Sequence, residues 1–187
     1  ATQSVARLIV ESLEAHDVDQ VYCVPGESYI GLTSTMVERN SIRVIVCRHE
    51  GGAGFMAAAD GRLRNRAGVC MVSRGPGLSN GLVALHSAFH DATPMVMLVG
   101  QVERKDFGRQ ALQEQDYSLL LADITKQVVH VNEPETASEA IARASVLLFT
   151  PLWDEPFGLA AIEAMACGLP IAAVENGAIR EVAGEVA

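Results

Sequence analysis

The stretch RHEGGAGFMAAADGRLRNRAG, residues 48–68, gives the clearest indication of the fold of this chain. It lies between two apolar runs at 42–47 and 68–73, a pattern that predicts a helix at 50–63 connecting two strands. Glycine and alanine fill much of this helix although glycine lowers helix stability, and such small residues let another backbone, a subunit or a flat ligand approach closely. Glu50 then stands where a strand ends and a helix begins, at the edge where parallel sheets bind ligands.

The same alternation of short apolar runs and helical stretches extends along the rest of the chain. Most runs are continuously apolar, as expected for parallel strands that helices cover on both faces. The sequence therefore predicts an α/β fold, a three-layer α/β/α sandwich with a mainly parallel, doubly wound (Rossmann- or flavodoxin-like) sheet of six or seven strands. The predicted strands lie at 18–24, 42–47, 68–73, 94–99, 127–131, 146–150 and 170–174, and the predicted helices at 3–16, 28–39, 50–63, 78–90 and 135–144.

Residues 101–124 interrupt this alternation. Charged side chains gather at 103–109, before a short apolar run at 119–121. Connections of that length in compact domains are usually functional or mobile. We expect a long excursion with one short helix that either belongs to a site or faces a partner.

Composition limits the partners and the compartment. The chain has 23 acidic and 14 basic residues and a formal charge of −9, which repels phosphate backbones and anionic lipid, so we expect neither nucleic acid nor a membrane as partner. No apolar run approaches the ~20 residues that span a bilayer, and no basic segment followed by an apolar leader is visible, so we expect a soluble, cytoplasmic protein. Three of the four cysteines lie in strand-like runs and none forms a CxxC pair, which favours a structural role.

Three glycine-containing motifs that follow the first three predicted strands carry a first family resemblance. They are VPGE at 24–27, the RHEGG segment around Glu50, and RGPGLSN at 74–80; the segments ALQEQD at 111–116 and HDATPMVMLVGQV at 90–102 extend the pattern. Together they make residues 1–144 resemble the pyrimidine-binding, N-terminal domain of thiamine diphosphate enzymes of the acetolactate synthase group. The structural alternative for each motif is a plain glycine-rich turn, and for Glu50 a helix cap.

This resemblance assigns roles to individual residues. It implies that Glu50 bonds the aminopyrimidine ring of thiamine diphosphate, favouring the tautomer that removes the thiazolium proton, and that Gln113 faces the reacting centre. It also implies that Pro25 and Gly26 contact the pyrimidine and that the segment from Gly75 to Asn80 lines the cleft. The family holds Mg²⁺ and the diphosphate with Gly-Asp-Gly and Asn-Asn motifs of a second domain that have no match here, so we expect no metal site and no tightly bound cofactor.

A second resemblance begins at residue 146. From there the sequence VLLFTPLWDEPFGLAAIEAMACGLPIAAVENGAIREVAG resembles the nucleotide-sugar-binding domain of retaining glycosyltransferases related to glycogen and sucrose synthases. The resemblance implies that Glu155 faces the sugar, that Glu163 bonds the ribose, and that the turn of Phe157, Gly158 and Leu159 approaches the donor diphosphate. The family's Arg and Lys pair has no match, and the apolar stripe of the helix suits a buried scaffold helix equally well.

We expect the two parts to form one domain, residues 1–187, because no flexible linker separates 1–144 from 145–187. The strand at 146–150 would replace the last strand of the first family. The strand at 170–174 then pairs beside it only if the strand at 127–131 is displaced or the segment is exchanged between chains. An unpaired apolar strand at the sheet edge and the helix of small residues both favour association. They predict a homodimer, with segment exchange between chains as one form of it.

Three functional hypotheses follow. The leading one is an engineered chimera of the two families, an α/β scaffold without catalytic activity. The second is the pyrimidine-binding subunit of a thiamine diphosphate-dependent 2-oxoacid decarboxylase or acetolactate synthase-like enzyme, which needs a separate diphosphate-binding chain. The third is a weak nucleotide-binding module.

Overall fold

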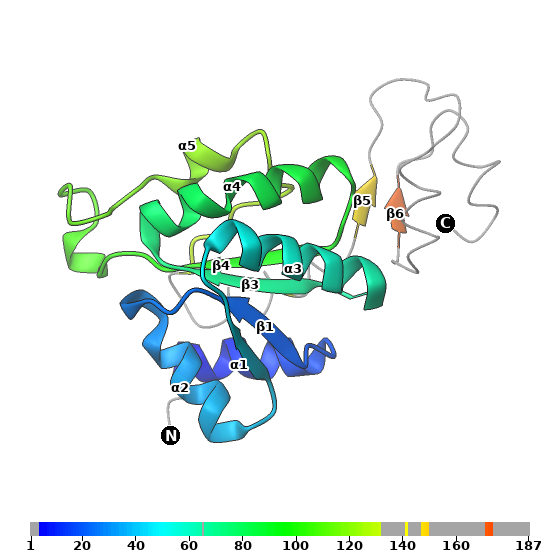
Figure 1. The fold of residues 1–187 in the computed structure, drawn as a ribbon. Coiled ribbons are helices and arrows are strands. Elements are labelled where there is room, and N and C mark those ends of the chain that lie inside the picture. Colours follow the sequence, from blue (N-terminus) through cyan, green and yellow to red (C-terminus); the bar gives the residue numbers. More distant parts are fainter. Residues whose placement is uncertain (1–3, 65, 132–140, 142–146, 150–170, 174–187) are drawn as a thin grey trace.

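A parallel sheet of four strands forms the centre of the protein in a computed structural model that describes residues 4–64, 66–131, 141, 147–149 and 171–173. Its strands are β1 (Gln20–Cys23), β2 (Arg43–Val46), β3 (Gly68–Val72) and β4 (Met95–Val99), in the order β2-β1-β3-β4 (Figure 1). Val21 pairs with Val44 on one side and with Val69 on the other. The strand order reverses between β1 and β3, and parallel sheets bind ligands at the carboxyl ends of the strands that flank such a switch point.

Helices cover both faces of this sheet, as the sequence predicts. The helices α1 (Val5–Ala15) and α2 (Ile30–Arg39) lie on one face, and α3 (Glu50–Arg64) and α4 (Arg74–His90) on the other (Figure 1). The short helices η1 (Glu27–Tyr29), η2 (Arg104–Asp106) and α5 (Tyr117–Leu121) lie in the connections, the last two within the predicted excursion. Within the described residues, none of the helices combines the length and the apolar character that a membrane crossing requires.

Each face of the sheet has its own apolar core. On the first face, Leu13 of α1 and Met36 of α2 are fully buried against the strands, and burial of one such side chain is worth about 1.5–3 kcal/mol. On the second face, the small residue Ala57 of α3 packs in one cluster with Cys70 of β3 and Leu78 of α4. Burial raises the pKa of the Cys70 thiol to about 12, in agreement with a structural cysteine. The predicted α/β architecture with a parallel sheet between helical layers is confirmed.

The predicted size of the central sheet, six or seven strands, is wrong. The central sheet has four strands among the described residues, and residues 127–131 are not a strand. The strands β5 (Leu147–Phe149) and β6 (Ile171–Ala173) do form where predicted, but they pair with each other in a separate parallel sheet, Leu147 opposite Ile171. In the described part of the chain the C-terminal strands therefore do not extend the central sheet. The helix predicted at 135–144 lies outside the described residues except for Ile141, which is helical and buried in the first core.

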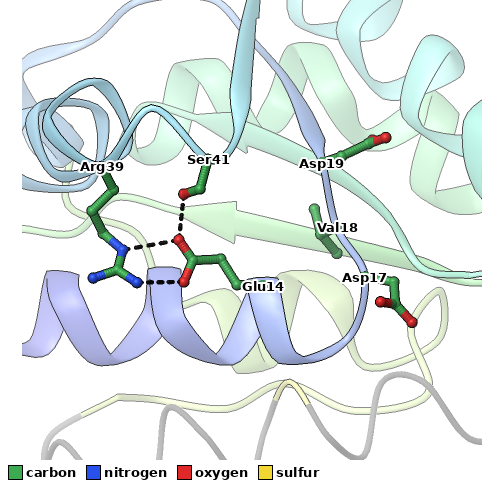
Figure 2. A pocket seen from close by; sticks show the side chains of 6 residues that line it. All are labelled: Glu14, Asp17, Val18, Asp19, Arg39 and Ser41. Atoms are coloured by element: carbon green, nitrogen blue, oxygen red, sulfur yellow. Dashed lines mark hydrogen bonds and ion pairs between the residues drawn. The ribbon is translucent and has the colours of Figure 1, made fainter.

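Paired charges line a shallow pocket of about 430 Å³ beside the amino end of β1 (Figure 2). Glu14 accepts hydrogen bonds from Arg39 at 2.6 and 2.9 Å and from Ser41, and Asp19 pairs with Arg64 at 2.9 Å. Asp17 and Val18 complete the lining. The pocket lies at the end of the sheet opposite to the switch point, and its Glu14, Arg39 and Asp19 side chains are held in ion pairs, so it is a surface ion-pair network rather than the candidate site.

This network predicts a pH-dependent stability. Hydrogen bonds from Arg39 and Ser41 lower the pKa of Glu14 from 4.5 to about 2. Because the pKa is lower in the folded than in the unfolded state, Glu14 contributes its full stabilisation above about pH 4.5 and loses it as the pH falls towards 2. We expect Glu14→Gln to lower the melting temperature at neutral pH, by an amount that shrinks between pH 4.5 and pH 2. Thermal unfolding followed by circular dichroism checks this, and a decrement that is independent of pH would contradict it.

Candidate functional site

The glycine-containing motifs of the N-terminal part lie together at the carboxyl edge of the sheet, where the strands end. The strand β1 leads into Pro25 and Gly26, β2 leads into Glu50 at the start of α3, and β3 leads into Gly75 at the start of α4. All four strands are parallel, so these segments meet at one edge. The edge includes the switch point between β1 and β3.

Glu50 is held by a neighbouring helix rather than by its own. Its side chain is half-buried, and Asn80 Nδ2 of α4 donates a hydrogen bond to Glu50 Oε2 at 3.0 Å. The free amide at the start of α3 is satisfied by a different group, since Gly51 N donates to His49 Nδ1 at 3.1 Å. This arrangement argues against Glu50 as a simple helix cap. The other carboxylate oxygen, Oε1, points to the first turn of α4, 3.5 Å from where a Cβ on Gly77 would stand.

The loops that follow β1 and β3 pack directly on each other at the switch point. A Cβ on Gly26 would lie 2.6 Å from Ser73 Cβ, so only glycine allows this approach. The hydroxyls of Ser28 and Ser73 lie 3.0 Å apart, and Arg74 pairs with Glu27 at 3.0 Å. The motifs alone assign no role to these polar partners, although Arg74 is the one cation within the RGPGLSN motif.

The long excursion reaches the same edge through Gln113. Gly75 N donates to the Gln113 carbonyl at 3.1 Å, and Arg74 Nη1 donates to the Leu112 carbonyl at 3.3 Å. Gln113 has a left-handed backbone, φ 64°, and its side chain is exposed. Backbone amides of Gly108 and Ala111 donate to the Glu114 carboxylate, which folds this loop and lowers the pKa of Glu114. The excursion is therefore tied to the start of α4.

The site residues predicted for the N-terminal part thus lie at one edge of the sheet. Glu50 and Asn80 are in contact, Gln113 contacts Gly75, and Gly26 approaches Ser73 next to Arg74. The described residues contain no group of three or more His, Cys, Asp or Glu side chains that could hold a metal ion. The second predicted set lies outside the described residues and comprises Glu155, Phe157, Gly158, Leu159 and Glu163.

Comparison with known proteins identifies the family of the N-terminal part, which contains Glu50 and Asn80. Residues 3–120 match the family described as thiamine pyrophosphate enzyme, N-terminal TPP binding domain. The chain belongs to the thiamine pyrophosphate enzyme family. It is 37% identical over 139 residues to the catabolic acetolactate synthase of Raoultella terrigena, which covers 74% of this chain and 25% of that protein.

Two further relatives give the same picture. The acetolactate synthase large subunit of Corynebacterium glutamicum is 33% identical over 145 residues, 78% of this chain and 23% of its own length. The large subunit of acetolactate synthase isozyme 1 of Escherichia coli (strain K12) is 34% identical over 152 residues, 79% of this chain and 27% of its own length. The chain spans about a quarter of the length of these relatives.

A second family match covers the C-terminal part. Residues 83–186 match the family described as glycosyl transferases group 1, and this range includes Glu155 and Glu163. The two matched ranges overlap at 83–120. Two families therefore meet in this chain, as the sequence analysis predicts.

Proposed function

We propose that the N-terminal part of this chain provides the pyrimidine side of a thiamine pyrophosphate site in an acetolactate synthase-type enzyme, and that the chain alone has no catalytic activity. The observation that carries the proposal is the Glu50 carboxylate, half-buried at the carboxyl edge of the sheet and oriented by Asn80 at 3.0 Å. The relatives that match this part are acetolactate synthases.

The residues at this edge fit the aminopyrimidine end of the cofactor. The Glu50 carboxylate oxygen that Asn80 does not bond, Oε1, can accept from a ring nitrogen or exchange a proton with it. The backbone of Pro25 and Gly26 and the first turn of α4 would bound the ring, and Gln113 would face the reacting centre. When bound, thiamine pyrophosphate supplies the carbon nucleophile for 2-oxoacid chemistry.

The described residues do not fit the charged end of the cofactor. Mg²⁺ prefers several oxygen ligands in near-octahedral geometry, and no suitable cluster of three or more His, Cys, Asp or Glu side chains occurs in the described part of the chain. The diphosphate would therefore need a second polypeptide region, and the relatives are about four times as long as the matched segment. The described residues would thus form half of a cofactor site, with activity only after a partner region is added.

A graft into a relative tests the proposal. Residues 1–131 of this chain would replace the matching segment of the isozyme 1 large subunit from Escherichia coli, and acetolactate formation would be assayed. We expect the graft to form acetolactate and the 187-residue chain alone to form none. A graft that folds, as judged by circular dichroism, but forms no acetolactate would overturn the half-site, whereas turnover by the chain alone would overturn only its inactivity.

We also propose that the chain is an engineered chimera of the two families. Its support is the second family match together with the separate pairing of β5 and β6. A nucleotide site at Phe157–Leu159 is proposed only as a weak one. Calorimetric titration with UDP and ADP tests it, and tight binding of either nucleotide would contradict the scaffold interpretation.

A homodimer is also proposed. Phe55, Met56 and Leu63 are 46%, 45% and 85% exposed on the outer side of α3, next to the small residues Gly52 and Ala59. Exposed apolar surface of this kind favours association. We expect sedimentation equilibrium to give twice the chain mass of 19.9 kDa, and Leu63→Lys to shift the protein towards the monomer. A monomeric mass for the unsubstituted chain at micromolar concentration would contradict the proposal.

A further inference from the structure

Two histidines project from the last two turns of α4. His86 and His90 are both exposed and are separated by one helical turn. Their ring centroids lie 4.5 Å apart, with an angle of 62° between the ring planes. The pair belongs to the C-terminal end of α4, whereas the candidate cofactor edge lies at its N-terminal end.

The spacing of the two rings matches that of two imidazoles on one metal ion. With metal–nitrogen bonds of about 2.0–2.1 Å and an angle of about 90–110° at the metal, the ring centroids would lie roughly 4.5–5.2 Å apart. The observed 4.5 Å is at the short end of this range, so the backbone need not move to bring both rings onto one ion. Rotation of the rings would suffice.

The surroundings favour a cation. His90 is the last residue of α4, a helix of 17 residues, so an ion bound here lies near the negative end of the helix dipole. The Phe89 and His90 rings lie in a T-shaped arrangement, with centroids 5.6 Å apart. Asp91 follows His90 in the sequence, and its carboxylate faces Arg62 at 3.7 Å. The net charge of −9 also attracts cations.

We propose that His86 and His90 form a surface binding site for a divalent transition metal ion. Imidazole nitrogen suits Cu²⁺, Ni²⁺ and Zn²⁺ but not Mg²⁺, and affinities in this series are highest for Cu²⁺. The two histidines supply two ligands, since the described residues contain no group of three or more candidate ligands, and water fills the other positions. The site is separate from the proposed cofactor site and does not depend on it.

Calorimetric titration of the untagged chain with Cu²⁺, Ni²⁺, Zn²⁺ and Mg²⁺ at neutral pH tests the proposal. We expect saturable binding of one Cu²⁺ per chain, weaker binding of Ni²⁺ and Zn²⁺, and none of Mg²⁺. Loss of an outer-shell partner alone costs about 10- to 100-fold in metal affinity, so His86→Asn or His90→Asn should weaken Cu²⁺ binding by roughly 100-fold. The matched control His130→Asn removes another exposed histidine, one that bonds Ser118, and should leave Cu²⁺ affinity unchanged.

The spectrum of bound Cu²⁺ provides a second readout. Electron paramagnetic resonance is expected to show coupling to two imidazole nitrogens in the unsubstituted chain and to one in either variant. Both histidines are exposed, so the variants should keep the circular dichroism spectrum of the parent. Equal Cu²⁺ affinity in the parent and in a folded His86→Asn, His90→Asn double variant would overturn the site, as would a Cu²⁺ spectrum that the double variant leaves unchanged.

Discussion

Replacement of Gly68 by alanine is expected to lower the free energy of unfolding by about 3 kcal/mol or more, because the added methyl group has no space. Gly68 begins β3, where its amide donates to the Pro94 carbonyl at 3.1 Å. A Cβ at this position would lie 1.8 Å from the Ala57 carbonyl oxygen and 2.9 Å from Gly61 N. Both are backbone atoms of α3, so the helix would have to move away from the sheet.

Gly52→Ala is the matched control for this substitution. Gly52 also lies in α3, but a Cβ there would meet nothing within 4 Å. Because alanine suits a helix interior better than glycine, we expect this variant to gain about 0.5–1 kcal/mol. Urea unfolding of both variants checks the pair of predictions. A Gly68→Ala protein as stable as the parent would contradict the close approach of α3 to β3.

Glu50→Gln in the grafted acetolactate synthase is expected to lower kcat by about 100- to 10,000-fold, the usual contribution of a positioned proton-transfer group. The amide of glutamine cannot exchange a proton with a ring nitrogen as the carboxylate can. It retains a carbonyl oxygen that can accept the hydrogen bond from Asn80 Nδ2. We therefore expect little change in melting temperature, so that the loss of activity reports chemistry and not misfolding.

Glu38→Gln serves as the control for this second prediction. Glu38 is an exposed glutamate of α2, a helix that lies on the opposite face of the sheet from α3. We expect its substitution to leave kcat unchanged. Steady-state rates of acetolactate formation compare the two variants, and a Glu50→Gln graft with full activity would contradict the assigned role of Glu50.

The sequence predicts the central fold well because its apolar runs form strands between two helical layers, with β1 and β3 fully buried. The four central strands and the start of α3 at Glu50 agree with prediction to within two residues. The helix α4 starts at Arg74, four residues before the predicted start at Leu78. The Gly-Pro-Gly sequence has the character of a turn, but Pro76 lies in the first helical turn, where amide groups have no partner within the helix and a missing N–H costs little.

The strand predicted at 127–131 was wrong for a different reason. Its valines favour a strand by composition, but a strand also needs a partner for its backbone groups, and composition carries no information on the partner. In the structure Val128 packs against the core of the second face, and His130 bonds Ser118 of α5. The segment thus contributes side chains to packing without joining the sheet.

The candidate site could be predicted in part. Glu50 and Asn80 stand in motifs directly after strands, and parallel topology brings such positions together, which local sequence suffices to predict. The contacts of Arg74 with Glu27 and with the Leu112 carbonyl join three segments that lie far apart in sequence. The left-handed backbone at Arg74, φ 37°, likewise depends on tertiary contacts, since a non-glycine residue seldom adopts it unaided.

Nuclear magnetic resonance of the ¹⁵N-labelled chain, titrated with thiamine pyrophosphate, tests whether Glu50 and its neighbours form the pyrimidine side of the cofactor site. We expect saturable shifts of the amides of Gly26, Glu50, Gly77 and Asn80, even at weak affinity. No saturable shift at these amides, or shifts confined to the pocket around Glu14 at the other end of the sheet, would contradict it.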